Sequence, residues 1–138
     1  WRPTQRVEQV WFSGVHCDVG GGYSADRNGT ALSDITLGWM LDKAAKEGLE
    51  IDPSIKDKYK LPLNAGLSLD QQHESWSVAW GIPKSRDIAA QAVLADSVSI
   101  RCTHKSDYRP SNLTFASGNL SDEYQMVEIV TQAKAAKA

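Results

Sequence analysis

Residues 7–23 read VEQVWFSGVHCDVGGGY, and this stretch decides the fold class. Its first part, residues 7–14, is an apolar run of β-branched and aromatic residues that ends at a glycine. Such a run is typical of a strand that is buried on both faces, as in a parallel sheet. Residues 15–32 are rich in Gly, Asp and Asn, which predicts a loop, and a helix is expected over 33–47. Strand, loop and helix together predict one β–α unit of an α/β sheet.

The helix over 33–47 has signals at both ends. Ser33 is a good N-cap, and Gly48 is placed as the C′ residue that ends the helix. Apolar side chains recur between these ends at helical spacing, and they predict the face that packs inward. These residues are Leu37, Met40, Leu41 and Ala44.

The rest of the chain predicts helices and long connections. Short helices are expected over 68–80 and 88–101, and a turn-rich, extended connection over 106–120. A last helix is expected to open at Ser121. The fold class is therefore α/β, with one clear buried strand followed by mostly helices and long loops. Because one strand cannot form a sheet, we expect the chain to be incomplete or to pair with another polypeptide.

The composition excludes several classes of function. The 138 residues fit the size of one domain, and a net charge of −2 argues against the basic surface that nucleic-acid binding needs. No apolar run is long enough to span a bilayer. Cys17 and Cys102 belong to no CxxC pair, so we expect reduced thiols and no structural zinc site.

The residues that could carry chemistry directly follow the predicted strand. In open α/β sheets ligands bind beyond the carboxyl ends of the strands, so we expect His16 at a functional site. An imidazole there can act as a general base near neutral pH, and Asp18 could hold the ring or stabilise the imidazolium. A loop histidine that satisfies its neighbours' hydrogen bonds, with Asp18 capping a turn, would explain the same residues. The predicted substrate contacts are Gly20, Gly21, Gly22 and Tyr23, since glycines permit close approach of a ligand.

Two other kinds of site fit these residues less well. Gly20-x-Gly22-x-x-Ala25 matches a loose dinucleotide fingerprint, but the predicted helix starts about eight residues too late for it. His16 and Asp18 could be half of a metal site, but two ligands do not define one. We therefore expect neither a metal ion nor a cofactor.

The other histidines and the serines lack a catalytic context. His73 shares a predicted helical face with Trp76, which indicates a packed histidine, and His104 lies among charged residues. No Gly-x-Ser-x-Gly elbow, which sets a nucleophilic serine on a strand-to-helix turn, occurs in the chain. A histidine without a nucleophile cannot carry out acyl transfer.

Several stretches of the chain resemble a known family. They are VEQVWFSGVHCDVGGGY (7–23), ALSDITLGWMLDKAAKEGL (31–49), HESW (73–76), DSV (96–98) and YRPSNL (108–113). The chain resembles the C-terminal part of the uncharacterised α/β-hydrolase domain family that includes the phospholipase effectors of bacterial type VI secretion. The first two stretches are the most specific.

The resemblance implies a serine hydrolase of lipid esters. Its serine would lie in an elbow upstream, His16 would be the last member of the triad, and the acid would be Asp18 or an upstream residue. His16 would take the serine proton and return it to the leaving alcohol. The resemblance assigns residues 1–120 to the C-terminal part of an α/β-hydrolase-like domain and 121–138 to a C-terminal helix and frayed tail. Without the nucleophile, we expect the chain alone to be inactive.

The expected partner is a lipid or other ester substrate, bound through the parent protein. Pairing with an N-terminal part, or self-association, would cover the free edge of the predicted strand. A soluble protein, cytoplasmic or delivered as a secreted effector, fits this interpretation. Two other functions stay open: a binding or assembly module that holds an anionic group in the Gly-rich loop, and a scaffold piece without a site.

Overall fold

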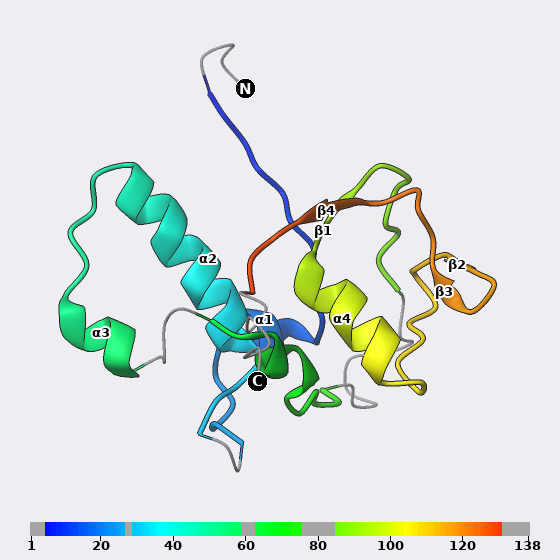
Figure 1. Ribbon diagram of the computed structural model, residues 1–138, viewed down its shortest axis with the longest axis horizontal. Helices are drawn as coiled ribbons and strands as arrows, with labels where there is room; N and C mark the ends of the chain where they lie inside the picture. The colour runs from blue at the N-terminus through cyan, green and yellow to red at the C-terminus, as the bar shows by residue number, and fades with distance from the viewer. Residues whose placement is uncertain (1–4, 27–28, 59–62, 76–84, 131–138) are drawn as a thin grey trace, which may run out of the picture.

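The computed structural model describes residues 5–26, 29–58, 63–75 and 85–130. These residues form short helices and strands, most of them joined by irregular connections (Figure 1). In chain order the elements are α1 His16–Gly20, α2 Ser33–Lys46, α3 Pro53–Lys58, the 3₁₀ helix η1 Ala65–Leu69, β1 Val93–Ala95, α4 Asp96–His104, β2 Phe115–Ala116, β3 Asn119–Leu120 and β4 Gln125–Val127. Helices combined with a small parallel sheet are compatible with the α/β class.

The parallel sheet brings together three distant parts of the chain. β1 pairs with β4 in parallel, with Leu94 opposite Met126. On its other side Leu94 forms an isolated parallel bridge with Trp11. The Trp11 N–H donates to the Val93 carbonyl, and the Ala95 N–H donates to the Trp11 carbonyl, both at 2.9 Å. β1 therefore lies between the N-terminal segment and β4, and Leu94 is fully buried.

The prediction of one continuous buried strand over 7–14 is wrong. Within this segment the chain is bridged to β1 only at Trp11, and Val7 is 58% exposed. Figure 1 shows the segment before Trp11 leaving the body of the molecule. An apolar run gives the tendency to form a strand, but a strand exists only where a neighbouring backbone pairs with it.

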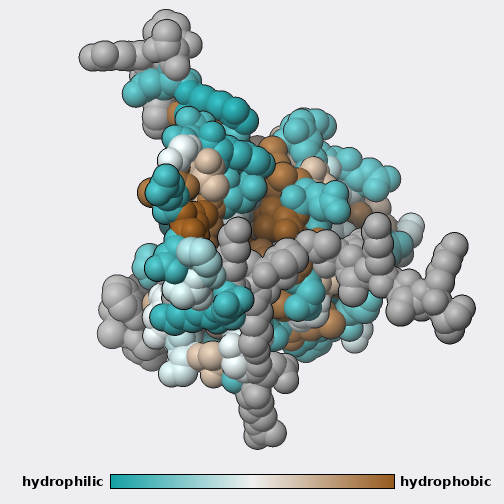
Figure 2. Space-filling model, turned by 60° about the vertical axis from the view of Figure 1, so that its left-hand side comes forward, coloured by the Kyte–Doolittle hydropathy of each residue, from teal (hydrophilic) through white to brown (hydrophobic). Residues whose placement is uncertain are grey.

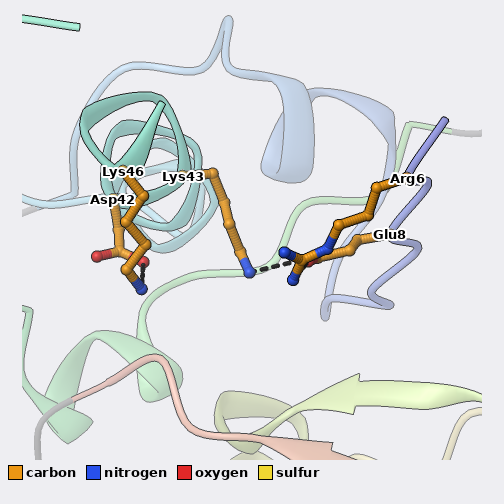
Figure 3. A network of polar contacts seen from close by, with 5 residues as sticks. All are labelled: Arg6, Glu8, Asp42, Lys43 and Lys46. Atoms are coloured by element: carbon orange, nitrogen blue, oxygen red, sulfur yellow. Dashed lines mark hydrogen bonds and ion pairs between the residues drawn. The ribbon is translucent and has the colours of Figure 1, made fainter. Parts of the chain in front are cut away.

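One ion pair on the surface ties the N-terminal segment to α2. Figure 3 shows Lys43 of α2 reaching Glu8, which also binds Arg6. The hydrogen bond from Lys43 lowers the pKa of the Glu8 carboxyl. A second pair, Lys46 with Asp42 at 2.7 Å, stays within α2. Such exposed ion pairs contribute little to stability, so the pair between Lys43 and Glu8 does not by itself fix the position of the N-terminal segment.

The helix predicted over 33–47 is confirmed as α2. The prediction of Ser33 as the N-cap is wrong, because Leu32 is the N-cap and Ser33 is the first helical residue. The Asp34 carboxylate accepts a hydrogen bond from the Ala31 N–H at 3.0 Å. At the other end Gly48 takes a φ of +93°, as expected for a C′ residue. The N–H groups of Gly48 and Leu49 close the helix on the carbonyls of its last turn.

The predicted inward face of α2 is wrong at Met40, which is 56% exposed. The helix instead buries Ile35, and Gly38 faces Leu63 so closely that a Cβ on Gly38 would lie 2.6 Å from the Leu63 side chain. The smallest residue of the helix therefore marks a contact face, and a count of apolar residues cannot detect this. The large hydrophobic residues that stay exposed are Val7, Met40, Leu49 and Met126. Figure 2 shows apolar surface between hydrophilic side chains on one face of the molecule.

The helices predicted further along the chain are correct only in part. Of the helix predicted over 68–80, η1 covers the first residues, 70–75 are not helical, and 76–80 lie outside the described residues. Of the helix predicted over 88–101, residues 96–101 are helical in α4, but 93–95 form β1. A short run such as Val-Leu-Ala has no periodicity that separates a strand from a helix.

The helix predicted from Ser121 is wrong over 121–130. Residues 125–127 form β4, whose pairing with β1 joins this part of the chain to the parallel sheet. Residues 131–138 lie outside the described residues. The predicted connection over 106–120 contains the hairpin β2–β3, which turns through positive φ angles at Ser117 and Gly118.

Two clusters of buried side chains form the core. One consists of Leu32, Ile35, Leu63, Leu67 and Val130, and the other of Leu94, Ala95, Val98, Cys102 and Tyr124. Phe12 and Ile129 pack against both clusters, so the segments next to the parallel sheet join them.

Cys17 and Cys102 are free thiols. None of the helices in the described ranges is long and apolar enough to cross a membrane.

Candidate active site around Asp18

The loop predicted over 15–32 contains one helical turn, α1, whose start is fixed by Asp18. The Asp18 Oδ2 accepts a hydrogen bond from the Val15 N–H at 3.0 Å, which satisfies a donor at the helix start. Gly14 makes room for this arrangement. Its φ is +111°, and a Cβ on it would lie 2.4 Å from the Asp18 Cβ. The sequence Gly-Val-His-Cys-Asp therefore folds around a carboxylate that is only 3% exposed.

Asp18 binds His73, which lies 55 positions further along the chain. The Asp18 Oδ1 lies 2.7 Å from the His73 Nδ1, and the Asp18 Oδ2 accepts from the His73 backbone N–H at 3.1 Å. Because a carboxylate only accepts hydrogen bonds, the Nδ1 carries the proton, and the described residues show no hydrogen bond to the Nε2. A buried carboxylate on the Nδ1 of a partly exposed histidine is the arrangement that orients an imidazole as a general base.

Tyr23 fixes the plane of the His73 ring. The two rings are stacked, with centroids 3.8 Å apart and planes 19° from parallel. Burial raises the pKa of the Tyr23 hydroxyl, and the charges of Cys17 and Asp18 raise it further. The imidazole is therefore held at its Nδ1 by Asp18 and on one face by an aromatic ring. Tyr23 was predicted to contact substrate, and its observed contact is with His73.

A polar hollow of about 380 Å³ borders this pair of residues. Asp18 and His73 line it, together with Tyr23 and the start of α2. Its other lining residues include Cys17, Ser24, Thr30, Ser33 and Gln71. The His73 side chain is 27% exposed, so a small polar group can reach it from this side.

His16, the histidine predicted to be catalytic, lies on the other side of α1. It is exposed and lines a larger cleft of about 790 Å³. The apolar residues lining this cleft include Trp11, Phe12, Leu94, Val98 and Leu113. Residues i and i+2 of a helix do not share a face, so the helical turn directs Asp18 away from His16. The sequence interpretation treated the segment as a loop and did not foresee this separation.

The predicted glycine loop divides between the two hollows. Gly20 lines the larger cleft with His16, and Tyr23 lines the smaller one with His73. Gly21 and Gly22 have φ angles of +84° and +126°, which ordinary side chains rarely adopt. These glycines reverse the chain after α1 and bring Tyr23 back over the ring of His73.

A second buried carboxylate binds Thr30, which lines the polar hollow. Asp70 accepts a hydrogen bond from the Thr30 hydroxyl at 2.7 Å and is 6% exposed. Burial raises the pKa of Asp70, and the neighbouring Asp26 and Asp34 also raise it. Within the described part of the chain, no group of three or more His, Cys, Asp or Glu residues is arranged to hold a metal ion.

Sequence reasoning missed the contact of His73 with Asp18. The predicted helical face that paired it with Trp76 does not exist at this position, because residues 70–75 are not helical. The available signal was the HESW stretch at 73–76, which is part of the family resemblance. A hydrogen bond across 55 residues has no local pattern, so periodicity alone could not reveal it.

The first part of the chain is similar to a family of phospholipase effectors. Residues 2–43 match the family model described as "T6SS, Phospholipase effector Tle1-like, catalytic domain". The chain is also similar to the Uncharacterized protein YEL023C of Saccharomyces cerevisiae, with 46% identity over 51 residues. That match covers 36% of this chain and only 8% of the length of the yeast protein. No solved structure matches the chain.

Proposed function

We propose that this chain supplies the acid and the histidine of a serine hydrolase that acts on phospholipid esters, with Asp18 as the acid and His73 as the general base. The observation that carries the proposal is the 2.7 Å contact between the buried Asp18 carboxylate and the His73 Nδ1. The match of residues 2–43 to the catalytic domain of phospholipase effectors supports the reaction class.

The chemistry follows from the position of the proton on His73. With the Nδ1–H held by Asp18, the Nε2 can take the proton of a serine hydroxyl as the serine attacks the ester carbonyl. The resulting imidazolium is stabilised by Asp18, and His73 then gives the proton to the leaving alcohol. No Gly-x-Ser-x-Gly elbow occurs in this sequence, so the serine has to come from polypeptide outside it.

The assignment of the base differs from the sequence prediction. His16 and His73 lie on opposite sides of α1, and only His73 has an acidic partner among the recorded contacts of the described residues. The polar hollow beside His73 suits the ester and the headgroup. The larger cleft beside His16 has a mixed lining, and its apolar part, formed by Trp11, Phe12 and Leu94 among others, suits a hydrocarbon chain. His16 is therefore proposed to line the substrate site and to take no part in proton transfer.

Paired variants test the proposal in the parent polypeptide that contains this chain and the serine elbow. In a phospholipid-vesicle hydrolysis assay we expect His73→Gln to lower kcat by about 10⁴-fold, as the loss of a triad function does. The matched control His16→Gln keeps kcat within about threefold, since a binding contact contributes much less than the base. The proposal fails if His16→Gln abolishes turnover while His73→Gln remains active. The isolated chain should show no turnover.

A further inference from the structure

Arg101 is a buried cation that no part of the proposed chemistry uses. It lies in the last turns of α4 and is 3% exposed. Its Nη1 donates to the carbonyls of Ser68 and Asp70, both at 2.8 Å. α4 and η1 pack against each other, so this guanidinium lies inside their contact.

The surroundings of Arg101 make its burial costly. Its Nε is buried without a hydrogen-bond partner among the described residues. The guanidinium lies over the Tyr108 ring at 5.1 Å. Burial lowers the pKa of Arg101, and nearby charges, including those of Asp18 and Asp70, partly offset this. An apolar side chain of similar length would fill the same space without this cost. The contribution that only a guanidinium makes here is the pair of bonds to the two carbonyls.

Those two carbonyls belong to the segment that leads to His73. Asp70 ends η1, and its side chain is also held by the Thr30 hydroxyl at 2.7 Å. His73 follows three residues later, a span of about 10 Å at most. A shift of the Asp70 backbone would therefore move the imidazole relative to Asp18 and to the ring of Tyr23.

We propose that Arg101 is a positioning residue, which holds the backbone at Ser68 and Asp70 so that the His73 ring meets Asp18. Its consequence for catalysis rests on the proposed function, because His73 has to be the base for its placement to matter. The placement itself is a separate claim about the structure and is tested without turnover.

The test is ¹H–¹⁵N NMR of the labelled full chain, with the Nδ1–H and ring-carbon protons of His73 as the readout. In the wild type we expect a hydrogen-bonded Nδ1–H signal and ring protons shifted by the stacked Tyr23. In Arg101→Met the Nδ1–H signal should be lost through solvent exchange, and the ring-proton shifts should collapse towards unstructured values. Circular dichroism records that the variant is folded.

Arg109 offers a matched control. It also donates to backbone carbonyls near the end of α4, including those of Cys102 at 2.9 Å and Tyr108 at 2.8 Å, but it makes no recorded contact with the 68–73 segment. Arg109→Met should keep both His73 signals. If Arg101→Met does not fold, Arg101→Lys decides, since it retains the charge and loses the guanidinium geometry. A folded Arg101 variant with wild-type His73 signals overturns the proposal, and so does an equal loss in Arg109→Met.

Discussion

Asp18 and Asp96 have the same structural role in two regions of the molecule, because the carboxylate of each accepts hydrogen bonds from backbone N–H groups. Asp18 in α1 accepts backbone hydrogen bonds from Val15 and from the distant His73. Asp96 at the start of α4 accepts from its neighbour Ser97 and from the distant Ile129 and Val130. Each carboxylate therefore ties a helix start to a segment that arrives from far along the chain.

The difference lies in what else the two carboxylates bind. The recorded partners of Asp96 are backbone N–H groups, whereas Asp18 also binds the imidazole of His73 beside a polar hollow. Holding a backbone segment requires only an acceptor, while orienting a base requires a titratable partner that substrate can reach. Asp96 therefore holds a backbone segment through its bonds to Ile129 and Val130, which we call the Asp96 clamp. Asp18 belongs to a proposed acid–base pair with His73.

The largest expected effect concerns turnover. In the parent polypeptide, Asp18→Asn keeps a side-chain acceptor but no longer fixes the tautomer of His73, so kcat should fall by about 10⁴-fold. Asp96→Asn, the matched change at the other clamp, should keep kcat within about threefold. Phospholipid hydrolysis by both variants under saturating substrate is the measurement. Equal losses of kcat would mean that both carboxylates are structural.

The second prediction concerns stability at the Asp96 clamp. Asp96→Ala removes the acceptor for the N–H groups of Ile129 and of the fully buried Val130. Because buried donors are left unsatisfied, the free energy of unfolding should fall by about 3 kcal/mol. Urea denaturation of the chain measures it. The exposed Asp122 is the control, and Asp122→Ala should change the unfolding free energy by less than about 0.5 kcal/mol. An unchanged urea midpoint for Asp96→Ala would show that the hydrogen bonds of Asp96 do not stabilise the fold.

A smaller loss is expected where the backbone makes room for Asp18. Gly14→Ala places a Cβ 2.4 Å from the Asp18 Cβ, at a φ of +111°. We expect a loss of about 2 kcal/mol in unfolding free energy, from backbone strain and from the displaced carboxylate. Gly20→Ala is the stability control, because no heavy atom lies within 4 Å of its added Cβ. Similar thermal melting of the two variants would contradict this role of Gly14.

The smallest effect is the pH dependence of stability at Asp70. Burial raises the folded-state pKa of Asp70 above its ordinary value of 3.8. Because the folded state holds the Asp70 proton more tightly than the unfolded state, the protonated carboxyl stabilises the fold below pH 3.8. This stabilisation is lost as the pH rises through the raised folded-state pKa. Asp70→Asn should flatten the decline in unfolding free energy just above pH 3.8, because the amide keeps an acceptor for Thr30 and does not titrate. Denaturation curves at several pH values measure this slope. Parallel pH profiles for wild type and variant would show that Asp70 does not contribute.

Local patterns predicted the parts of the fold that depend on neighbours in sequence. α2, with Asp34 in its first turn and Gly48 after its end, follows from helix signals that act within a few residues. β1 and β4 could not be predicted in this way, because three-residue strands exist only through their pairing with each other and with Trp11. The helices predicted over 88–101 and from Ser121 therefore fell where part of the chain forms the sheet.

The proposed site combines Asp18, which the sequence interpretation named, with His73, which it did not. The sequence interpretation named Asp18 in the segment after residues 7–14 but did not foresee its burial. The prediction that His16 would be its partner rested on adjacency in sequence. Both residues lie in α1 two positions apart, so their side chains point to different faces, and the ring that Asp18 holds comes from position 73. Two residues that are adjacent in sequence lie in the same segment, but the two residues of an acid–base pair need side chains that meet.

The most direct test of the central claim is ¹H–¹⁵N NMR of the imidazole nitrogens in the full chain. The account predicts a hydrogen-bonded Nδ1–H signal of His73, distinct from that of the exposed His104 beside the Ile100 carbonyl, that disappears in Asp18→Asn and is unchanged in His16→Gln. A signal that persists in Asp18→Asn, or that disappears in His16→Gln, would contradict the pairing of Asp18 with His73.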